Sequence, residues 1–78
     1  MDWVLEHQGR FLPIETKLSD RPTERDAKHL GVFMDEYRAR AGLIVCTAPR
    51  TLRLNPRVTA VPWQSLPEVL RASVKAMR

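Results

Sequence analysis

The chain contains only one cysteine, Cys46, so it cannot form an internal disulfide, and no residues nearby have the spacing of zinc ligands. No apolar run approaches the ~18 residues that a membrane-spanning helix needs. The first residues lack the basic region and long apolar core of a secretory signal. Internal repeats and low-complexity linkers are also lacking. We therefore expect one domain over residues 1–78, a cytoplasmic location and no contact with a membrane.

The composition is that of a small globular domain, with 44% hydrophobic and 28% charged residues among 78. A chain of this size buries roughly 60–65% of the surface that its unfolded form exposes, so its core is small. The net charge of +4 is uneven: residues 1–49 carry seven basic and eight acidic side chains, residues 50–78 six basic and one acidic. This basic second half is compatible with nucleic-acid binding, although many small soluble domains share such a bias.

A β-hairpin is predicted at the N-terminal end, because residues 2–6 and 11–18 both alternate between polar and apolar side chains. Gly9 supplies the positive φ that a tight two-residue turn with Gln8 requires. The resulting register pairs Trp3 with Ile14, Leu5 with Leu12, Val4 with Pro13, Glu6 with Phe11, and Asp2 with Glu15. A slip by one residue would mix the apolar and the acidic face, so the pattern favours this register.

A helix is predicted over residues 23–40 from apolar side chains at helical spacing. Thr23 and Asp26 have the spacing of a capping box at its start, and Gly42 is placed to end it. The apolar run that follows, residues 43–47, is typical of a strand that is buried on both faces. A right-handed crossover through the helix makes this strand parallel to the second strand of the hairpin.

Two weaker strands and a second helix are predicted in the last third of the chain. Residues 51–54 and 58–62 form the strand pair, and residues 65–77 form the helix. Ser65 is expected to cap this helix, with Glu68 completing the capping box. The complete pattern predicts an α/β (α+β) fold: a mixed sheet with an N-terminal hairpin, a crossover helix to a buried parallel strand, and a C-terminal helix.

Three charged side chains of the hairpin are candidates for chemistry: Asp2, Glu15 and Lys17. Opposite residues of a non-hydrogen-bonded antiparallel pair have Cα atoms about 4.5 Å apart, so the two carboxylates repel and the pKa of one should rise. A hard divalent cation such as Mg²⁺ relieves this repulsion, because it takes one or two carboxylates and keeps several waters. Lys17 points to the same face and can reach a metal-bound water. These groups suit metal-assisted hydrolysis of a phosphodiester.

This arrangement resembles the PD-(D/E)xK nuclease pattern, in which an Asp on one hairpin strand precedes a hydrophobic residue, Glu, any residue and Lys on the next. The pattern here is Asp2 followed by Ile14-Glu15-Thr16-Lys17. Further similarity lies in residues 2–6 (DWVLE), 13–17 (PIETK), 42–45 (GLIV) and 58–63 (VTAVPW). These stretches resemble the small nuclease-like domain at the C-terminus of a bacterial and archaeal AAA-type ATPase family. The likeness extends over about residues 2–67.

The resemblance implies a restriction-endonuclease-like core and a role for each motif residue. Asp2, Glu15 and the backbone carbonyl of Thr16 would be ligands of Mg²⁺, for which Mn²⁺ can substitute. Lys17 would position or activate the attacking water, so Asp2, Glu15 and Lys17 would form the catalytic set. DNA is the implied substrate, and an ATPase domain of the parent protein is the implied partner.

Three departures from the family pattern lower the activity that we expect of this chain. The helix and strand that precede the Asp-bearing strand in these nucleases have no counterpart before Asp2. Met1 replaces the proline of the motif, and no ATP-binding loop is present. We therefore expect the C-terminal portion of a larger protein, with weak or absent cleavage. The alternative is a non-catalytic module that contacts nucleic acid or protein beside an ATPase, with self-association possible through an open sheet edge.

The same residues also have plainer interpretations. Asp2, Glu15 and Lys17 would be ordinary on the solvated face of a half-buried hairpin. Trp3 and Trp63 can stack on bases, but packing into the core is the favoured interpretation.

Overall fold

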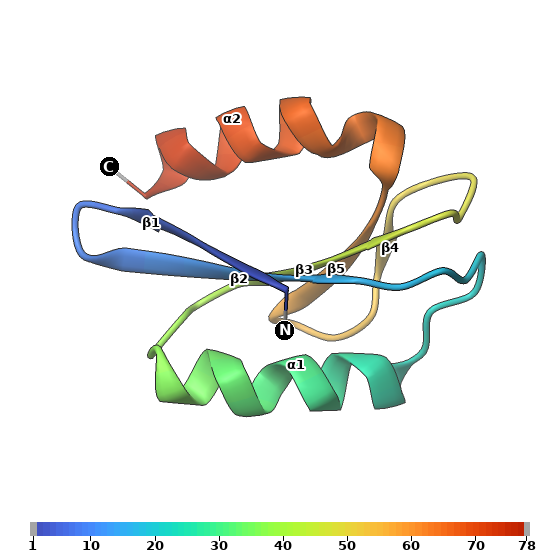
Figure 1. Cartoon of the computed structure of the whole chain (residues 1–78), viewed down its shortest axis with the longest axis horizontal. Helices are drawn as coiled ribbons and strands as arrows, with labels where there is room; N and C mark the ends of the chain where they lie inside the picture. Colours follow the sequence, from blue (N-terminus) through green and yellow to red (C-terminus); the bar gives the residue numbers. More distant parts are fainter. Residues whose placement is uncertain (1, 78) are drawn as a thin grey trace.

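In the computed structural model, which describes residues 2–77, a five-stranded sheet has one helix on each face (Figure 1). The strands are β1 (Trp3–His7), β2 (Arg10–Thr16), β3 (Gly42–Cys46), β4 (Leu52–Arg53) and β5 (Val58–Pro62), and the helices are α1 (Glu24–Glu36) and α2 (Leu66–Ala76). A short 3₁₀ turn, η1 (Trp63–Ser65), leads into α2. Met1, in the place of the motif's proline, and Arg78 lie outside the described residues. This mixed sheet with two helices confirms the predicted fold class.

The hairpin of β1 and β2 has the predicted register. Its ladder pairs Trp3 with Ile14, Val4 with Pro13, Leu5 with Leu12, and Glu6 with Phe11. The predicted pair of Asp2 with Glu15 is not part of the ladder: β1 begins at Trp3, and the Asp2 N–H donates to the carbonyl of Ile14 at 3.1 Å. The turn residues Gln8 and Gly9 both have positive φ values, 54° and 78°, as in the type I′ turns that match the twist of paired strands. The Glu6 carboxylate supports the turn, because it accepts the Gly9 N–H at 2.8 Å.

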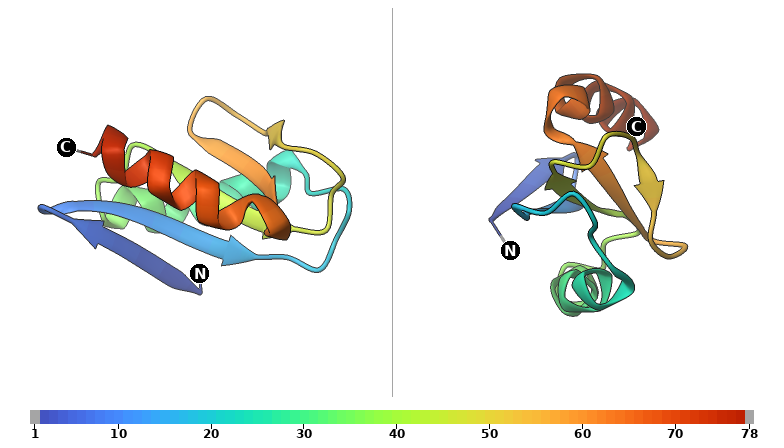
Figure 2. Two further views of the ribbon diagram at one scale, coloured as in Figure 1. Left: turned by 90° about the horizontal axis from the view of Figure 1, so that it is seen from above. Right: turned by 90° about the vertical axis from the view of Figure 1, so that its right-hand side faces the viewer.

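The order of the strands in the sheet is β1-β2-β3-β5-β4. β3 pairs parallel with β2, as the crossover predicted, and β5 pairs parallel with β3 on its other side. The short β4 pairs antiparallel with β5, which confirms the weaker strand pair. Figure 2 shows the same sheet from two further sides. Because β2, β3 and β5 run in one direction, their carboxyl ends meet at one edge of the sheet.

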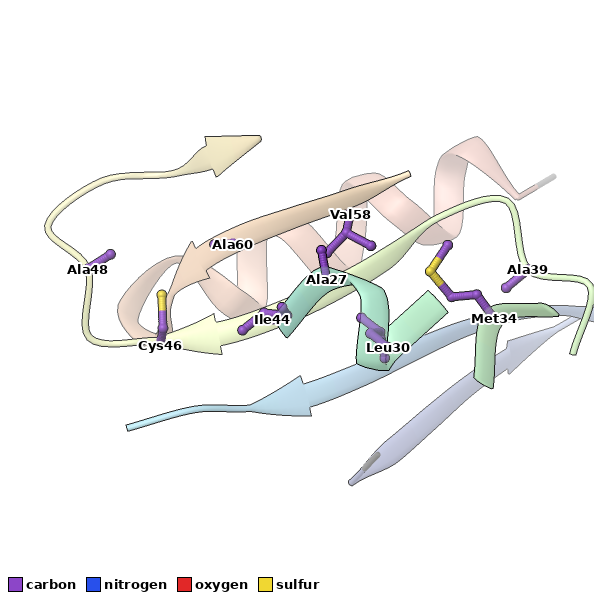
Figure 3. Close-up of a cluster of buried hydrophobic side chains, with 9 residues drawn as sticks. All are labelled: Ala27, Leu30, Met34, Ala39, Ile44, Cys46, Ala48, Val58 and Ala60. Atoms are coloured by element: carbon purple, nitrogen blue, oxygen red, sulfur yellow. The ribbon is translucent and has the colours of Figure 1, made fainter. Parts of the chain in front are cut away.

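β3 is buried along its whole length, because α1 covers one of its faces and α2 the other. The cluster on the α1 side, drawn in Figure 3, comprises Ala27, Leu30, Met34, Ala39, Ile44, Cys46, Ala48, Val58 and Ala60. The cluster on the α2 side comprises Leu12, Ile14, Leu43, Val45 and Val61, against which Leu66, Val69, Leu70 and Met77 pack. No residue of α2 is fully buried, so α2 covers its face less completely than α1. Within residues 2–77, neither helix has the length and hydrophobicity of a bilayer-spanning segment.

The predicted end of the first helix is wrong. α1 ends at Glu36 rather than at residue 40, and Arg38 then adopts a left-handed conformation with φ 54°. Gly42 does not end the helix but begins β3. A Cβ atom at Gly42 would lie 2.8 Å from Met34 Sδ and 2.9 Å from Leu30 Cδ2. The absent side chain therefore lets α1 pack closely on the start of β3.

The second helix has its N-cap at Ser65, as predicted, but the predicted capping bond is absent. Ser65 has helical backbone angles, φ −88° and ψ −5°, and makes no side-chain cap bond, because η1 runs directly into α2. The capping box of α1 is confirmed: the Asp26 carboxylate accepts the N–H of Thr23 at 2.8 Å.

Candidate functional site

The predicted site residues lie at the end of the hairpin where β2 stops. Asp2 directly precedes β1, Glu15 and Thr16 are the last residues of β2, and Lys17 follows them. The backbone N–H of Lys17 donates to the carbonyl of Val45 at 2.8 Å, which ties this segment to the centre of the sheet. The site therefore lies at the ends of two paired strands.

Asp2 is fixed to the end of β2 by two hydrogen bonds. Its Oδ2 atom accepts the backbone N–H of Thr16 at 2.6 Å and the Thr16 hydroxyl at 2.5 Å. The hydroxyl and then the N–H lower the pKa of Asp2, because both bonds favour the ionised carboxylate. The expectation of a pKa raised by repulsion thus does not hold for Asp2. The bonds place its negative charge beside the segment that carries Glu15 and Lys17.

Lys17 is paired with α1. Its Nζ atom lies 2.9 Å from Oδ1 of Asp26, which stands in the first turn of the helix. This contact is the largest of the causes that lower the pKa of Asp26. The sequence assigned Asp26 only to the capping box, and no local spacing linked it to Lys17. The pair arises because the chain that leaves β2 turns back and lays α1 against the same face of the sheet.

Glu15 lies on the α1 face of β2 and is half-buried. Ile14, its neighbour, packs in the cluster on the α2 side, and successive residues of a strand point to opposite faces. Glu15 and Lys17 therefore share one face, as the sequence predicted from their spacing.

The donor set for a metal at this site is small. Within residues 2–77 no group of three or more His, Cys, Asp or Glu side chains could hold a metal ion. The predicted ligands are only two carboxylates, Asp2 and Glu15, and the carbonyl of Thr16. Mg²⁺ accepts so few protein ligands because it retains several of its waters, so these residues suit a weakly held Mg²⁺.

A hollow of about 500 Å³ opens beside Thr16 and Lys17, whereas Asp2 and Glu15 do not line it. It is lined by Thr16, Lys17, Leu18, Val45, Cys46, Thr47 and Trp63. The hollow lies at the carboxyl ends of β2, β3 and β5, where ligands commonly bind in sheets with parallel strands. This hollow was not predicted from the sequence, because the predicted crossover brings the carboxyl ends of only two of these strands side by side.

The two tryptophans are not core residues, so that interpretation was wrong. Trp63 is 60% exposed at the rim of the hollow, and Trp3 is 54% exposed at the start of β1. Leu18, also in the lining of the hollow, is 99% exposed. Cys46, by contrast, is buried and free, as its place in an apolar strand predicted.

Comparison with known proteins places these features in a family. Residues 1–66 match a family described as a domain of unknown function, DUF4143. The chain belongs to the DUF4143 family. No curated protein and no solved structure matches it. The DUF4143 match includes all the candidate residues and every strand of the sheet, whereas α2 beyond Leu66 lies outside it.

Proposed function

We propose that this DUF4143 chain is a nuclease-like module in which Asp2, Glu15 and the Thr16 carbonyl hold Mg²⁺ weakly and phosphodiester hydrolysis is slow. DNA is the proposed substrate. One observation carries the proposal: the Asp2 carboxylate reaches the backbone N–H of Thr16 at 2.6 Å. This contact holds the acid of the first strand against Thr16, the residue that stands between Glu15 and Lys17 in the nuclease pattern.

The slow rate is proposed because Lys17 is engaged elsewhere. An ammonium group assists hydrolysis only when it is directed at the charge that develops on the phosphate or at the attacking water. The Lys17 ammonium instead lies 2.9 Å from the Asp26 carboxylate, which α1 holds in place through its capping contact with Thr23. To assist the reaction, Lys17 has to leave this partner.

A plasmid cleavage assay in millimolar Mg²⁺ or Mn²⁺ tests the proposal. We expect slow nicking that Glu15→Gln and Lys17→Ala both abolish, whereas only Glu15→Gln weakens the binding of the metal. Asp26→Asn should accelerate nicking, because it removes the charge that holds Lys17 and keeps an oxygen that can accept the Thr23 N–H. Thr23→Ala is the matched control, since it alters the cap and leaves the Lys17–Asp26 pair in place.

Two outcomes would refute the proposed hydrolysis. Nicking that survives in both Glu15→Gln and Lys17→Ala would come from a contaminant or from another site. A chain that neither binds Mg²⁺ or Mn²⁺ nor cleaves would lack the proposed site altogether.

The second candidate is a non-catalytic module that contacts nucleic acid or protein beside an AAA-type ATPase domain. The partners that Asp2 and Lys17 already have favour this function, as does the exposure of Leu18 and Trp63 at the hollow. Within residues 2–77, β1 is an edge strand of the sheet, which also offers a place for self-association. Analytical ultracentrifugation distinguishes these contacts: a dimer of the chain alone would indicate self-association, and a complex with an ATPase-bearing parent protein would indicate a contact with that protein.

A further inference from the structure

A second concave surface lies at the opposite end of β2 from the candidate site. It is a groove of about 580 Å³ between the hairpin turn, the segment that follows α1, and the C-terminal end of α2. Figure 1 shows these three segments at one end of the molecule. β2 separates the groove from the candidate site by about 20 Å, because Arg10 and Thr16 are its two ends and a strand rises about 3.3 Å per residue.

Three arginines line this groove: Arg10, Arg38 and Arg40. All three are exposed, and none takes part in the side-chain ion pairs described within residues 2–77, which are Lys17–Asp26 and Arg57–Asp35. No acidic residue belongs to the lining. The groove therefore presents a concentration of positive charge without a described counter-charge.

Most of the lining between the arginines is apolar. Leu12 and Ala39 are buried beneath it, and Met77 contributes from the end of α2. The aromatic residues of the lining, Phe11 and Tyr37, pack on each other with ring centroids 5.3 Å apart. Because the two rings cover part of each other, less ring surface is left for stacking on nucleic-acid bases.

We propose that this groove binds an acidic, partly apolar polypeptide segment of a partner protein. The apolar lining suits hydrophobic side chains of the segment, and the guanidinium groups of Arg10, Arg38 and Arg40 suit its carboxylates, which arginine binds through paired hydrogen bonds. The proposal goes beyond hydrolysis at the Asp2–Glu15–Lys17 end. It concerns different residues and needs no metal.

A peptide-binding experiment with the full chain in EDTA tests this assignment. The probe is a fluorescein-labelled eight-residue peptide of alternating glutamate and leucine, whose affinity is measured by anisotropy. The groove variant carries Arg10→Gln, Arg38→Asn and Arg40→Gln. Asparagine is chosen at position 38 because it tolerates the left-handed φ of 54°. The control variant carries Arg25→Gln, Lys28→Gln and Arg50→Gln, which remove the same charge from exposed positions outside the groove.

We expect the groove variant to bind the glutamate–leucine peptide roughly 3- to 100-fold more weakly, because it loses three exposed ion pairs with the peptide. The control variant should change the affinity less than about twofold, and a glutamate–serine peptide of equal charge should bind the parent chain more weakly.

Equal losses in both variants, or equal affinities for the two peptides, would overturn the proposal. Tighter binding of an oligothymidylate that only the groove variant loses would reassign the groove to nucleic acid. EDTA keeps the result independent of the proposed Mg²⁺ site, and unfolding curves verify that both variants fold.

Discussion

Gly42→Ala tests how closely α1 lies on the sheet. A methyl group at Gly42 would meet Met34 Sδ at 2.8 Å and Leu30 Cδ2 at 2.9 Å, well inside the usual carbon contact of about 3.5–4.0 Å. Both neighbours are completely buried, with 0% exposure, so they can move only by disturbing the core. Overpacking of this kind costs about 1–3 kcal/mol. In a domain of this size, each kcal/mol lowers Tm by roughly 4–8 °C.

Gly31→Ala is the matched control, because it adds the same methyl group to α1 itself. A Cβ there would lie 3.4 Å from Nη2 of Arg57, the flexible end of an exposed side chain. Alanine favours a helix interior over glycine by about 1 kcal/mol, so this variant should be as stable as the parent or more stable. Urea unfolding followed by circular dichroism measures both. Equal or greater stability of Gly42→Ala would refute the close packing of α1 on β3.

Two further predictions concern the charged residues of the candidate site, and NMR titration of the carboxyl groups checks both. Thr16→Val removes the hydroxyl donor and should raise the pKa of Asp2 towards its ordinary value; an unchanged pKa would show that this bond does not form in solution. Because the folded pKa of Asp2 is lowered, its stabilising contribution is present above the unfolded value of about 3.9 and is lost as the pH falls through the folded pKa. Lys17→Ala should raise the pKa of Asp26, whereas Lys28→Ala, on the same helix, should not. Equal effects of the two lysine variants would contradict the Lys17–Asp26 pair.

The hairpin and the order of the elements could be predicted because local rules determine them. Alternation in the two strands left one register that separates apolar from acidic residues, and Gly9 supplied the turn. The uniformly apolar β3 indicated a strand covered on both faces, which the two helices provide. In these segments the local pattern and the tertiary packing require the same conformation.

The features that the sequence analysis missed depend on contacts between distant segments. Gly42 resembles a helix terminator, and only the side chains of α1 packed over it show why a glycine stands there. The pairing of Lys17 with Asp26 depends on how α1 packs against the sheet, which the local sequence around either residue does not specify. Ser65 stands at the N-cap of α2, but its side chain makes no cap bond because η1 runs directly into the helix. Trp63 was expected in the core because it is a large aromatic residue, yet it follows β5 directly and lies at the rim of the hollow.

Titration of the ¹⁵N-labelled chain with Mg²⁺, followed by amide chemical shifts, tests the metal site most directly. We expect shifts confined to Asp2, Glu15, Thr16 and Lys17 at millimolar Mg²⁺, and their loss in Glu15→Gln. Unchanged amides at this end of β2, or shifts spread over acidic residues elsewhere in the chain, would contradict a metal site there.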